Sequence, residues 1–167
     1  MIFGRAGEEI EALRQANVEY EIVPGVTAAL GAAAVAGIPL THRHASSTLV
    51  FTAGHHAAEN EDADWSRCAE THSTLVVYMP GSNYTQIASR LTAAGFAEDT
   101  PCAIISQATT PGQHVHRTTI FDLRRAPKLA APTLLMIGDL VRFADRNSIQ
   151  QATDVPDLQP EVRALFI

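Results

Sequence analysis

The fold is decided by residues 23–43, which read VPGVTAALGAAAVAGIPLTHR. A proline–glycine pair opens this stretch, and Thr27 is a suitable N-cap for a helix that we predict over residues 26–36. Gly37 follows at the position where a helix commonly ends. Alanine and glycine occupy nearly every face of the helix, so another element can approach its backbone closely. We therefore predict a helix packed tightly against a sheet or a ligand.

Helix and strand patterns alternate on both sides of this stretch. An amphipathic helix is predicted over residues 7–17, a short strand over residues 21–23 and a further helix over residues 83–94. Apolar or alternating runs predict later strands at residues 47–52, 74–79, 102–106, 114–120 and 133–137. The run at 114–120 alternates, as expected of an antiparallel strand with one solvated face. The class is therefore α/β, with a mixed, mostly five-stranded sheet flanked by helices.

Length and composition exclude several classes of protein. The chain has 167 residues, 46% of them hydrophobic, and a formal net charge of −6. Such a chain can bury a core, and its acidic charge argues against nucleic-acid binding. No apolar run reaches the roughly 18 residues that a membrane helix needs, and the acidic N-terminal segment is unlike a secretory signal. We therefore expect a cytoplasmic protein with no membrane partner. Its two cysteines are too few for a disulfide framework.

General catalytic signatures are absent, and the histidines give only a weak metal signal. The seven histidines include three close pairs without a carboxylate or cysteine at ligand spacing, so we predict no metal site. One pair, His114 and His116, would share a face of its strand and could chelate an ion. The other two pairs are His42 with His44, and His55 with His56.

Four segments taken together resemble one known family. They are IFGRAGEE at residues 2–9, the 23–43 stretch, LVVYM at residues 75–79 and PTLLMIGDLV at residues 132–141. In this order they are similar to the tetrapyrrole methylase family, and GIPLTHR is characteristic of its uroporphyrinogen-III C-methyltransferase branch. The resemblance covers residues 2–143. This chain departs from the family pattern at two positions. Ala6 stands where the family has glycine, and Pro80 stands between Met79 and Gly81, where the family has Met-Gly.

The resemblance also implies a domain organisation. The family has two α/β domains, and the matching segments belong to the second, C-terminal domain. We therefore expect residues 1–22 to be a remnant or hinge of the N-terminal domain, residues 23–144 to form the C-terminal methylase domain, and residues 145–167 to be a tail. The glycine-rich part of the first domain has no counterpart in this sequence, so a separate N-terminal methylase domain is an expected partner.

The family binds S-adenosylmethionine between its two domains and releases S-adenosylhomocysteine. The positions matching its cofactor contacts are Ile2, Thr27, Ala28, Met79 and Ala108. Apolar walls with free helix N–H groups suit adenosine, as these residues would provide. The residues themselves leave alternatives open: Ile2, Ala28 and Met79 could be ordinary core residues, and Thr27 a simple N-cap.

The implied reaction is the methylation of uroporphyrinogen III to precorrin-2, on the route to sirohaem or cobalamin. Arg5, Arg43 and Met79 match substrate-facing positions, and arginines pair bidentately with carboxylates like those of this substrate. Glu8 and Arg5 match the family's catalytic positions, and the glutamate is the group that takes the proton lost after methylation. Without the resemblance, Arg5 and Glu8 would read as an exposed ion pair and Arg43 as a loop charge.

Three hypotheses follow from this resemblance. The chain is an active methylase, an inactive truncated paralogue that binds or dimerises, or one half of a split methylase. A methylase acting on a later corrin intermediate is a further alternative, against which GIPLTHR argues. Because the family forms homodimers and the expected domain face is apolar, we predict a homodimer.

Overall fold

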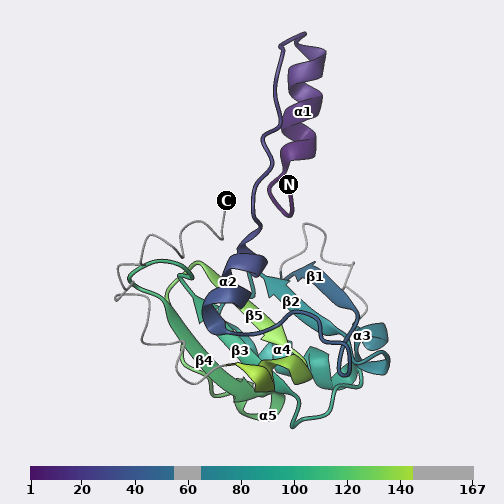
Figure 1. The fold of residues 1–167 in the computed structure, drawn as a ribbon, viewed down its shortest axis with the longest axis vertical. Coiled ribbons are helices and arrows are strands. Elements are labelled where there is room, and N and C mark those ends of the chain that lie inside the picture. The colour runs from purple at the N-terminus through teal and green to yellow at the C-terminus, as the bar shows by residue number, and fades with distance from the viewer. Residues whose placement is uncertain (55–64, 145–167) are drawn as a thin grey trace, which may run out of the picture.

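The computed structural model describes residues 1–54 and 65–144 of the chain (Figure 1). Its elements are, in chain order, α1 (Ala6–Gln15), α2 (Ala28–Ala36), β1 (Leu49–Ala53), α3 (Ser66–Glu70), β2 (Thr74–Tyr78), α4 (Tyr84–Ala93), β3 (Pro101–Ser106), β4 (His114–Thr119), α5 (Ile120–Leu123), β5 (Thr133–Ile137) and the 3₁₀ helix η1 (Asp139–Phe143).

The strands form one mixed sheet in the order β1-β2-β5-β3-β4. Strand β1 pairs in parallel with β2, and every other neighbouring pair is antiparallel. Strands β2 and β3 are buried along their whole length, which explains their nearly continuous apolar sequences. The predicted α/β class and five-stranded mixed sheet are confirmed, and the alternating run beginning at His114 is indeed an antiparallel edge strand.

Helices cover both faces of the sheet. Helices α3, α4 and α5 pack on one face around the fully buried Leu91 and Leu123, while α2 and η1 pack on the other. Successive residues of β2 alternate between these cores: Leu75 belongs to the first and Val76 to the second. The chain is therefore a three-layer α/β/α body, with α2 lying across the sheet in Figure 1.

Small residues allow α2 to approach the sheet, as predicted. Ala29, Ala32 and Ala36 are completely buried against it. Gly37 ends the helix with φ 63°, a left-handed conformation that favours glycine. Thr27 occupies the predicted N-cap position, but its side chain forms no capping hydrogen bond within the helix.

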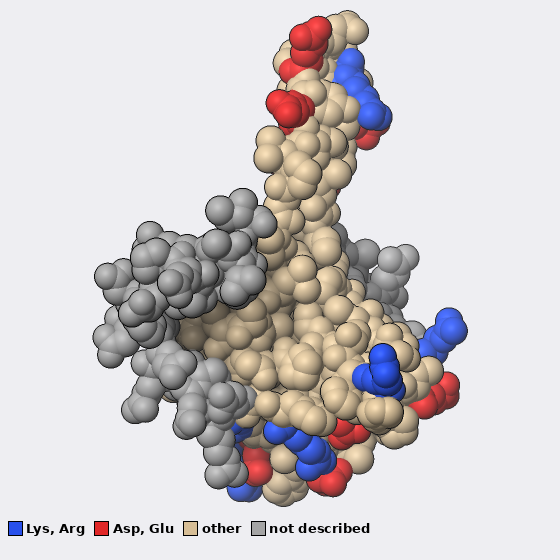
Figure 2. Space-filling model, in the orientation of Figure 1, with Lys and Arg blue, Asp and Glu red and all other residues tan. Residues whose placement is uncertain are grey.

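Residues 1–26 form an arm that stands away from the body in Figure 1. The predicted amphipathic helix forms as α1, yet none of its residues is buried. The predicted strand at residues 21–23 is wrong: the segment has no strand assignment. A strand needs a partner for its ladder of hydrogen bonds, and no described strand pairs with these residues. Figure 2 shows charged side chains at the far end of the arm and low on the body, whereas the described residues visible around the arm's base are uncharged.

The predicted tail at residues 145–167 lies outside the described residues, as does the segment 55–64 that contains His55 and His56. Among the helices that the structure describes, none is long and apolar enough to cross a membrane.

Candidate functional site

A cavity of about 400 Å³ opens where β2 and β3 end and where α2 and β5 begin. Strands β2 and β3 both run antiparallel to β5, so their carboxyl ends meet at one edge of the sheet. Apolar side chains supply most of the wall, including Ala32, Ile105 and Leu134. Thr27 and Thr109 add hydroxyl groups to this wall. The cavity is thus mainly apolar with a few polar groups, which is the usual character of a small-molecule site.

Tyr78 connects the sheet to the start of α2 at this cavity. Its hydroxyl oxygen lies 2.5 Å from Thr27 Oγ1 and accepts a hydrogen bond of 3.1 Å from the Ala29 N–H. The Phe3 ring packs against the Tyr78 ring, with ring centroids 5.1 Å apart, and this contact connects the N-terminal segment to the cavity. Tyr78 is not among the site residues predicted from the sequence. A tyrosine at the end of a buried apolar strand nevertheless indicates a hydroxyl that needs a hydrogen-bond partner.

Three residues with a left-handed backbone conformation lie in or beside the cavity wall. Met79, Gln107 and Thr109 have φ values of 49°, 47° and 66°, and none of them is glycine. Met79 follows β2, whereas Gln107 and Thr109 follow β3. Such conformations are uncommon for side-chain-bearing residues and concentrate at functional sites. Other non-glycine residues with positive φ, among them His72, do not line this cavity, so backbone conformation alone does not mark it.

The structure brings together four of the five predicted cofactor residues. Thr27, Ala28, Met79 and Ala108 all line the cavity, although the first two lie on α2 and the others after different strands. Ile2 does not line it. Its side chain is exposed, and the next residue is the Phe3 that lies against Tyr78.

The predicted substrate residues lie outside the cavity, apart from Met79. Arg5 and Glu8 form an exposed ion pair at the start of α1, in which Arg5 Nε donates to Glu8 Oε2 at 3.0 Å. This hydrogen bond, together with the Arg5 charge, lowers the pKa of Glu8. Arg43 is exposed in the turn between α2 and β1 and does not line the cavity.

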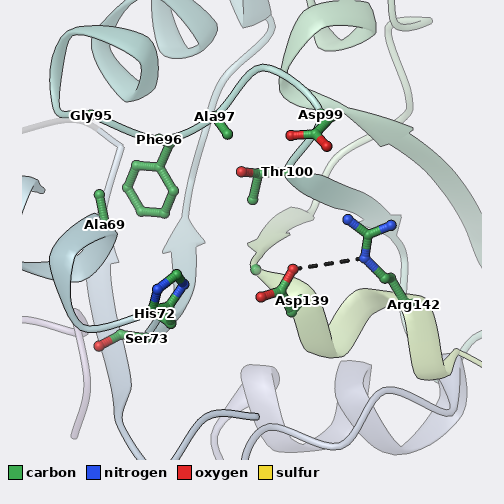
Figure 3. Close-up of a pocket in the computed structure, with 11 residues that line it drawn as sticks. Ala69, His72, Ser73, Gly95, Phe96, Ala97, Asp99, Thr100, Asp139 and Arg142 are labelled. Atoms are coloured by element: carbon green, nitrogen blue, oxygen red, sulfur yellow. Dashed lines mark ion pairs between the residues drawn. The ribbon is translucent and has the colours of Figure 1, made fainter.

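A second, more polar pocket of about 270 Å³ lies at the opposite edge of the sheet (Figure 3). It lies where β2 and β3 begin and β5 ends, and it contains none of the predicted site residues. Its charged side chains include Asp139 and Arg142, which form an ion pair of 3.7 Å. Asp99 is the second acidic side chain of the lining, so two carboxylates face one arginine there.

The remaining reactive side chains form no second centre in the described part of the chain. No group of three or more histidine, cysteine or acidic residues there could hold a metal ion, and His55 and His56 lie outside it. Cys68 and Cys102 are both buried, and neither forms a disulfide bond. Burial raises the pKa of the Cys102 thiol, so this group is a poor nucleophile.

Comparison with known proteins fits this geometry. The family described as Tetrapyrrole (Corrin/Porphyrin) Methylases matches residues 1–124. The chain belongs to the tetrapyrrole methylases. This tetrapyrrole methylase is 40% identical over 158 residues to siroheme synthase of Psychromonas ingrahamii, with 94% of the chain and 34% of the relative covered. It is 46% identical to siroheme synthase of Zymomonas mobilis, with 93% and 34% covered. The chain thus spans about a third of the length of these curated relatives.

Solved structures give the same result at the level of the fold. Uroporphyrin-III C-methyl transferase from Thermus thermophilus, in complex with S-adenosylhomocysteine, superposes with a TM-score of 0.73 at 30% identity. The match covers 85% of this tetrapyrrole methylase and 63% of that chain. A cobalt precorrin-4 methyltransferase superposes equally well, with a TM-score of 0.73 at 25% identity, and the match covers 84% and 60% of the two chains.

Proposed function

We propose that this chain binds S-adenosylmethionine in the cavity at the end of β2 and β3. We propose further that it takes part in the methylation of uroporphyrinogen III to precorrin-2, on the route to sirohaem or cobalamin. The observation that carries the proposal is that Thr27, Ala28, Met79 and Ala108 line one cavity. The solved relative that holds S-adenosylhomocysteine supports the same assignment.

The residues present fit such a ligand. The volume of about 400 Å³ falls within the range of roughly 300–1,000 Å³ usual for small-molecule sites. Ala28 and Met79 offer apolar surface to an adenosine group. Thr27 lies at the N-terminus of α2, where backbone N–H groups without helical partners can donate to ligand oxygens.

S-adenosylmethionine supplies an electrophilic methyl group on a sulfonium. We propose that Arg5 and Arg43 bind carboxylates of the tetrapyrrole and that Glu8 accepts the proton lost from its carbon framework. The lowered pKa of Glu8 keeps its carboxylate ionised but makes it a weak base. A substrate carboxylate that engages Arg5 would weaken the Arg5–Glu8 bond and desolvate Glu8, and both effects raise the pKa of Glu8.

A methyl-transfer assay tests this assignment. Labelled S-adenosylmethionine and uroporphyrinogen III are incubated with the full chain, with its Glu8→Gln variant and with the control Glu19→Gln. We expect transfer by the parent and by Glu19→Gln, and a loss of at least about 100-fold in Glu8→Gln, the size usual for a general base. Equal rates in all three would overturn the role of Glu8. No transfer by the parent, alone or with a separate first methylase domain, would contradict the proposed reaction.

A second proposal concerns partners. We propose that the arm, residues 1–26, docks onto a second copy of the chain, so that the protein is a homodimer. Supporting this, Val18, Ile22, Val23 and Val26 expose between 48% and 81% of their surface. Several large apolar residues exposed within one short segment indicate an interaction site. The alternative occupant is a separate N-terminal methylase domain, for which residues 1–22 would be the hinge.

We also propose that the protein works in the cytoplasm. Neither Cys68 nor Cys102 forms a disulfide bond, which is usual in a reducing compartment.

A further inference from the structure

The loop between β3 and β4, residues 107–113, holds two cavity-lining residues, Ala108 and Thr109. Hydrogen bonds hold its first residue, Gln107, through both its N–H and its carbonyl. The Gln107 N–H donates to the Pro132 carbonyl at 2.8 Å, next to β5. Within the loop, Thr110 Oγ1 donates to the Gln107 carbonyl, also at 2.8 Å. The loop therefore forms one wall of the cavity, and its own hydrogen bonds hold it in place.

Gln107 and Thr109 both have a left-handed backbone in this loop, and Thr109 is the β-branched one of the two. Threonine is β-branched, and a φ of 66° is costly for such a residue, by about 1–3 kcal/mol. Its N–H donates to Gln113 Oε1 at 2.8 Å, with good hydrogen-bond geometry. Gln113 thus bridges the loop from its far end and holds Thr109 in a conformation that it would otherwise leave.

Thr109 is also where the loop meets α2. A Cβ added at Gly31 would lie 3.7 Å from Thr109 Cγ2, and both residues line the cavity. The conformation of Thr109 therefore sets how this wall closes against the helix. Because N–H and C=O point in opposite directions across a trans peptide, the Gln113 bond also fixes the direction of the Ala108 carbonyl.

We propose that Gln113 is a positioning residue for the ligand cavity. It touches no ligand itself. It presents the Ala108–Thr109 peptide in one fixed orientation, so that the ligand need not order the wall when it binds. This role rests on the proposed function, since the ligand is taken to be S-adenosylmethionine or its product.

The experiment compares two near-isosteric variants of Gln113. Gln113→Glu keeps an acceptor oxygen for the Thr109 N–H, whereas Gln113→Met keeps the length and loses it. Gln86→Met is the matched control, because Gln86 lies on the exposed side of α4 and lines no part of this cavity. S-adenosylhomocysteine binding to the full chain is measured by calorimetry, and amide hydrogen exchange of Thr109 by NMR.

We expect Gln113→Met to bind S-adenosylhomocysteine about tenfold more weakly, as for one lost hydrogen bond, and to exchange the Thr109 amide faster. Gln113→Glu should retain binding and protection, and Gln86→Met should match the parent. If the parent binds and Gln113→Met binds equally well, the positioning role is wrong while the proposed function stands. If the parent does not bind, the proposed function fails and this role with it. Faster Thr109 exchange in Gln113→Met would even then show that the hydrogen bond itself exists.

Discussion

Tyr78 joins three segments of the chain through one side chain. Its hydroxyl accepts the buried Ala29 N–H and contacts Thr27 Oγ1, while its ring contacts Phe3. We predict that Tyr78→Phe lowers the free energy of unfolding by about 1–3 kcal/mol, because a buried N–H loses its partner. It should also weaken S-adenosylhomocysteine binding, since α2 begins at this contact. Denaturant unfolding and calorimetry measure the two effects.

Tyr20→Phe is the control for this prediction. The Tyr20 hydroxyl accepts a hydrogen bond from Arg14 Nε on the exposed arm, where water can replace it. It should change neither quantity appreciably. A Tyr78→Phe variant as stable as Tyr20→Phe would show that Tyr78 does not hold the start of α2.

Arg5 sets the protonation of Glu8, and the direction of its effect can be measured. The hydrogen bond lowers the pKa of Glu8 in the folded chain. The ion pair therefore contributes fully to folding stability at pH values above the ordinary glutamate pKa. That contribution is lost as the pH falls through the lowered value. We predict that Arg5→Met raises the pKa of Glu8, as measured by NMR titration of its carboxyl carbon. Arg14→Met, on the same helix, should not. An unchanged Glu8 pKa in Arg5→Met would contradict the ion pair.

At the scale of elements, the turn after β2 depends on Gly54, the residue that directly follows the neighbouring strand β1. The Gly54 N–H donates to the Tyr78 carbonyl at 2.7 Å. A Cβ at Gly54 would lie 2.6 Å from the Met79 carbonyl oxygen and 2.8 Å from Pro80 Cα. Both are backbone atoms, so the turn carrying Met79 must move.

We predict that Gly54→Ala destabilises the fold by about 1–3 kcal/mol, the usual cost of overpacking, and weakens S-adenosylhomocysteine binding by displacing Met79. Thermal unfolding and calorimetry test this. Gly7→Ala is the control, since a Cβ there meets nothing within 4 Å. The interpretation of the turn is wrong if Gly54→Ala behaves like Gly7→Ala.

Helices and strands were predictable where their sequence pattern matches their burial and packing in the fold. Helix α2 follows from its small residues and the glycine that ends it, and the central strands follow from continuous apolar runs. The structure of residues 21–23 was not predictable. Their sequence is typical of a strand, but it does not show whether another strand lies where it could pair with them. The left-handed turns at Met79 and Thr109 were also missed, because single-residue preferences do not reveal the hydrogen bonds beside them. The Thr109 N–H donates to the Gln113 side chain in the same loop, and the Gly54 N–H donates to the Tyr78 carbonyl just before Met79.

The candidate site was predictable only through the family resemblance. Ala28 and Ala108 carry no chemistry that would select them, and only the fold brings them to one cavity. Tyr78 and Gln113 act through hydrogen bonds that the sequence does not reveal. The fold could thus be read from residue patterns, whereas the site required either a relative or a structure.

At the scale of the whole molecule, the arm's apolar surface predicts self-association. Val18 and Ile22 are 50% and 48% exposed and alternate with glutamates, as on one face of an unpaired strand. We predict a dimer by light scattering at high concentration, and weaker association in Val18→Asp with Ile22→Asp. Phe121→Asp, a similar change on α5, is the control. A monomer at every concentration would contradict the homodimer; a complex formed only with a separate methylase domain would favour the alternative partner.

The whole account depends on the cavity at the end of β2 and β3 being a cofactor site. Calorimetric titration of the full chain with S-adenosylhomocysteine addresses this without requiring the tetrapyrrole or catalysis. We predict one site per chain with micromolar affinity, abolished by Ala28→Trp, which fills the cavity, and retained in Glu8→Gln, which lies outside it. No binding by the parent chain, or equal binding by Ala28→Trp, would contradict the account.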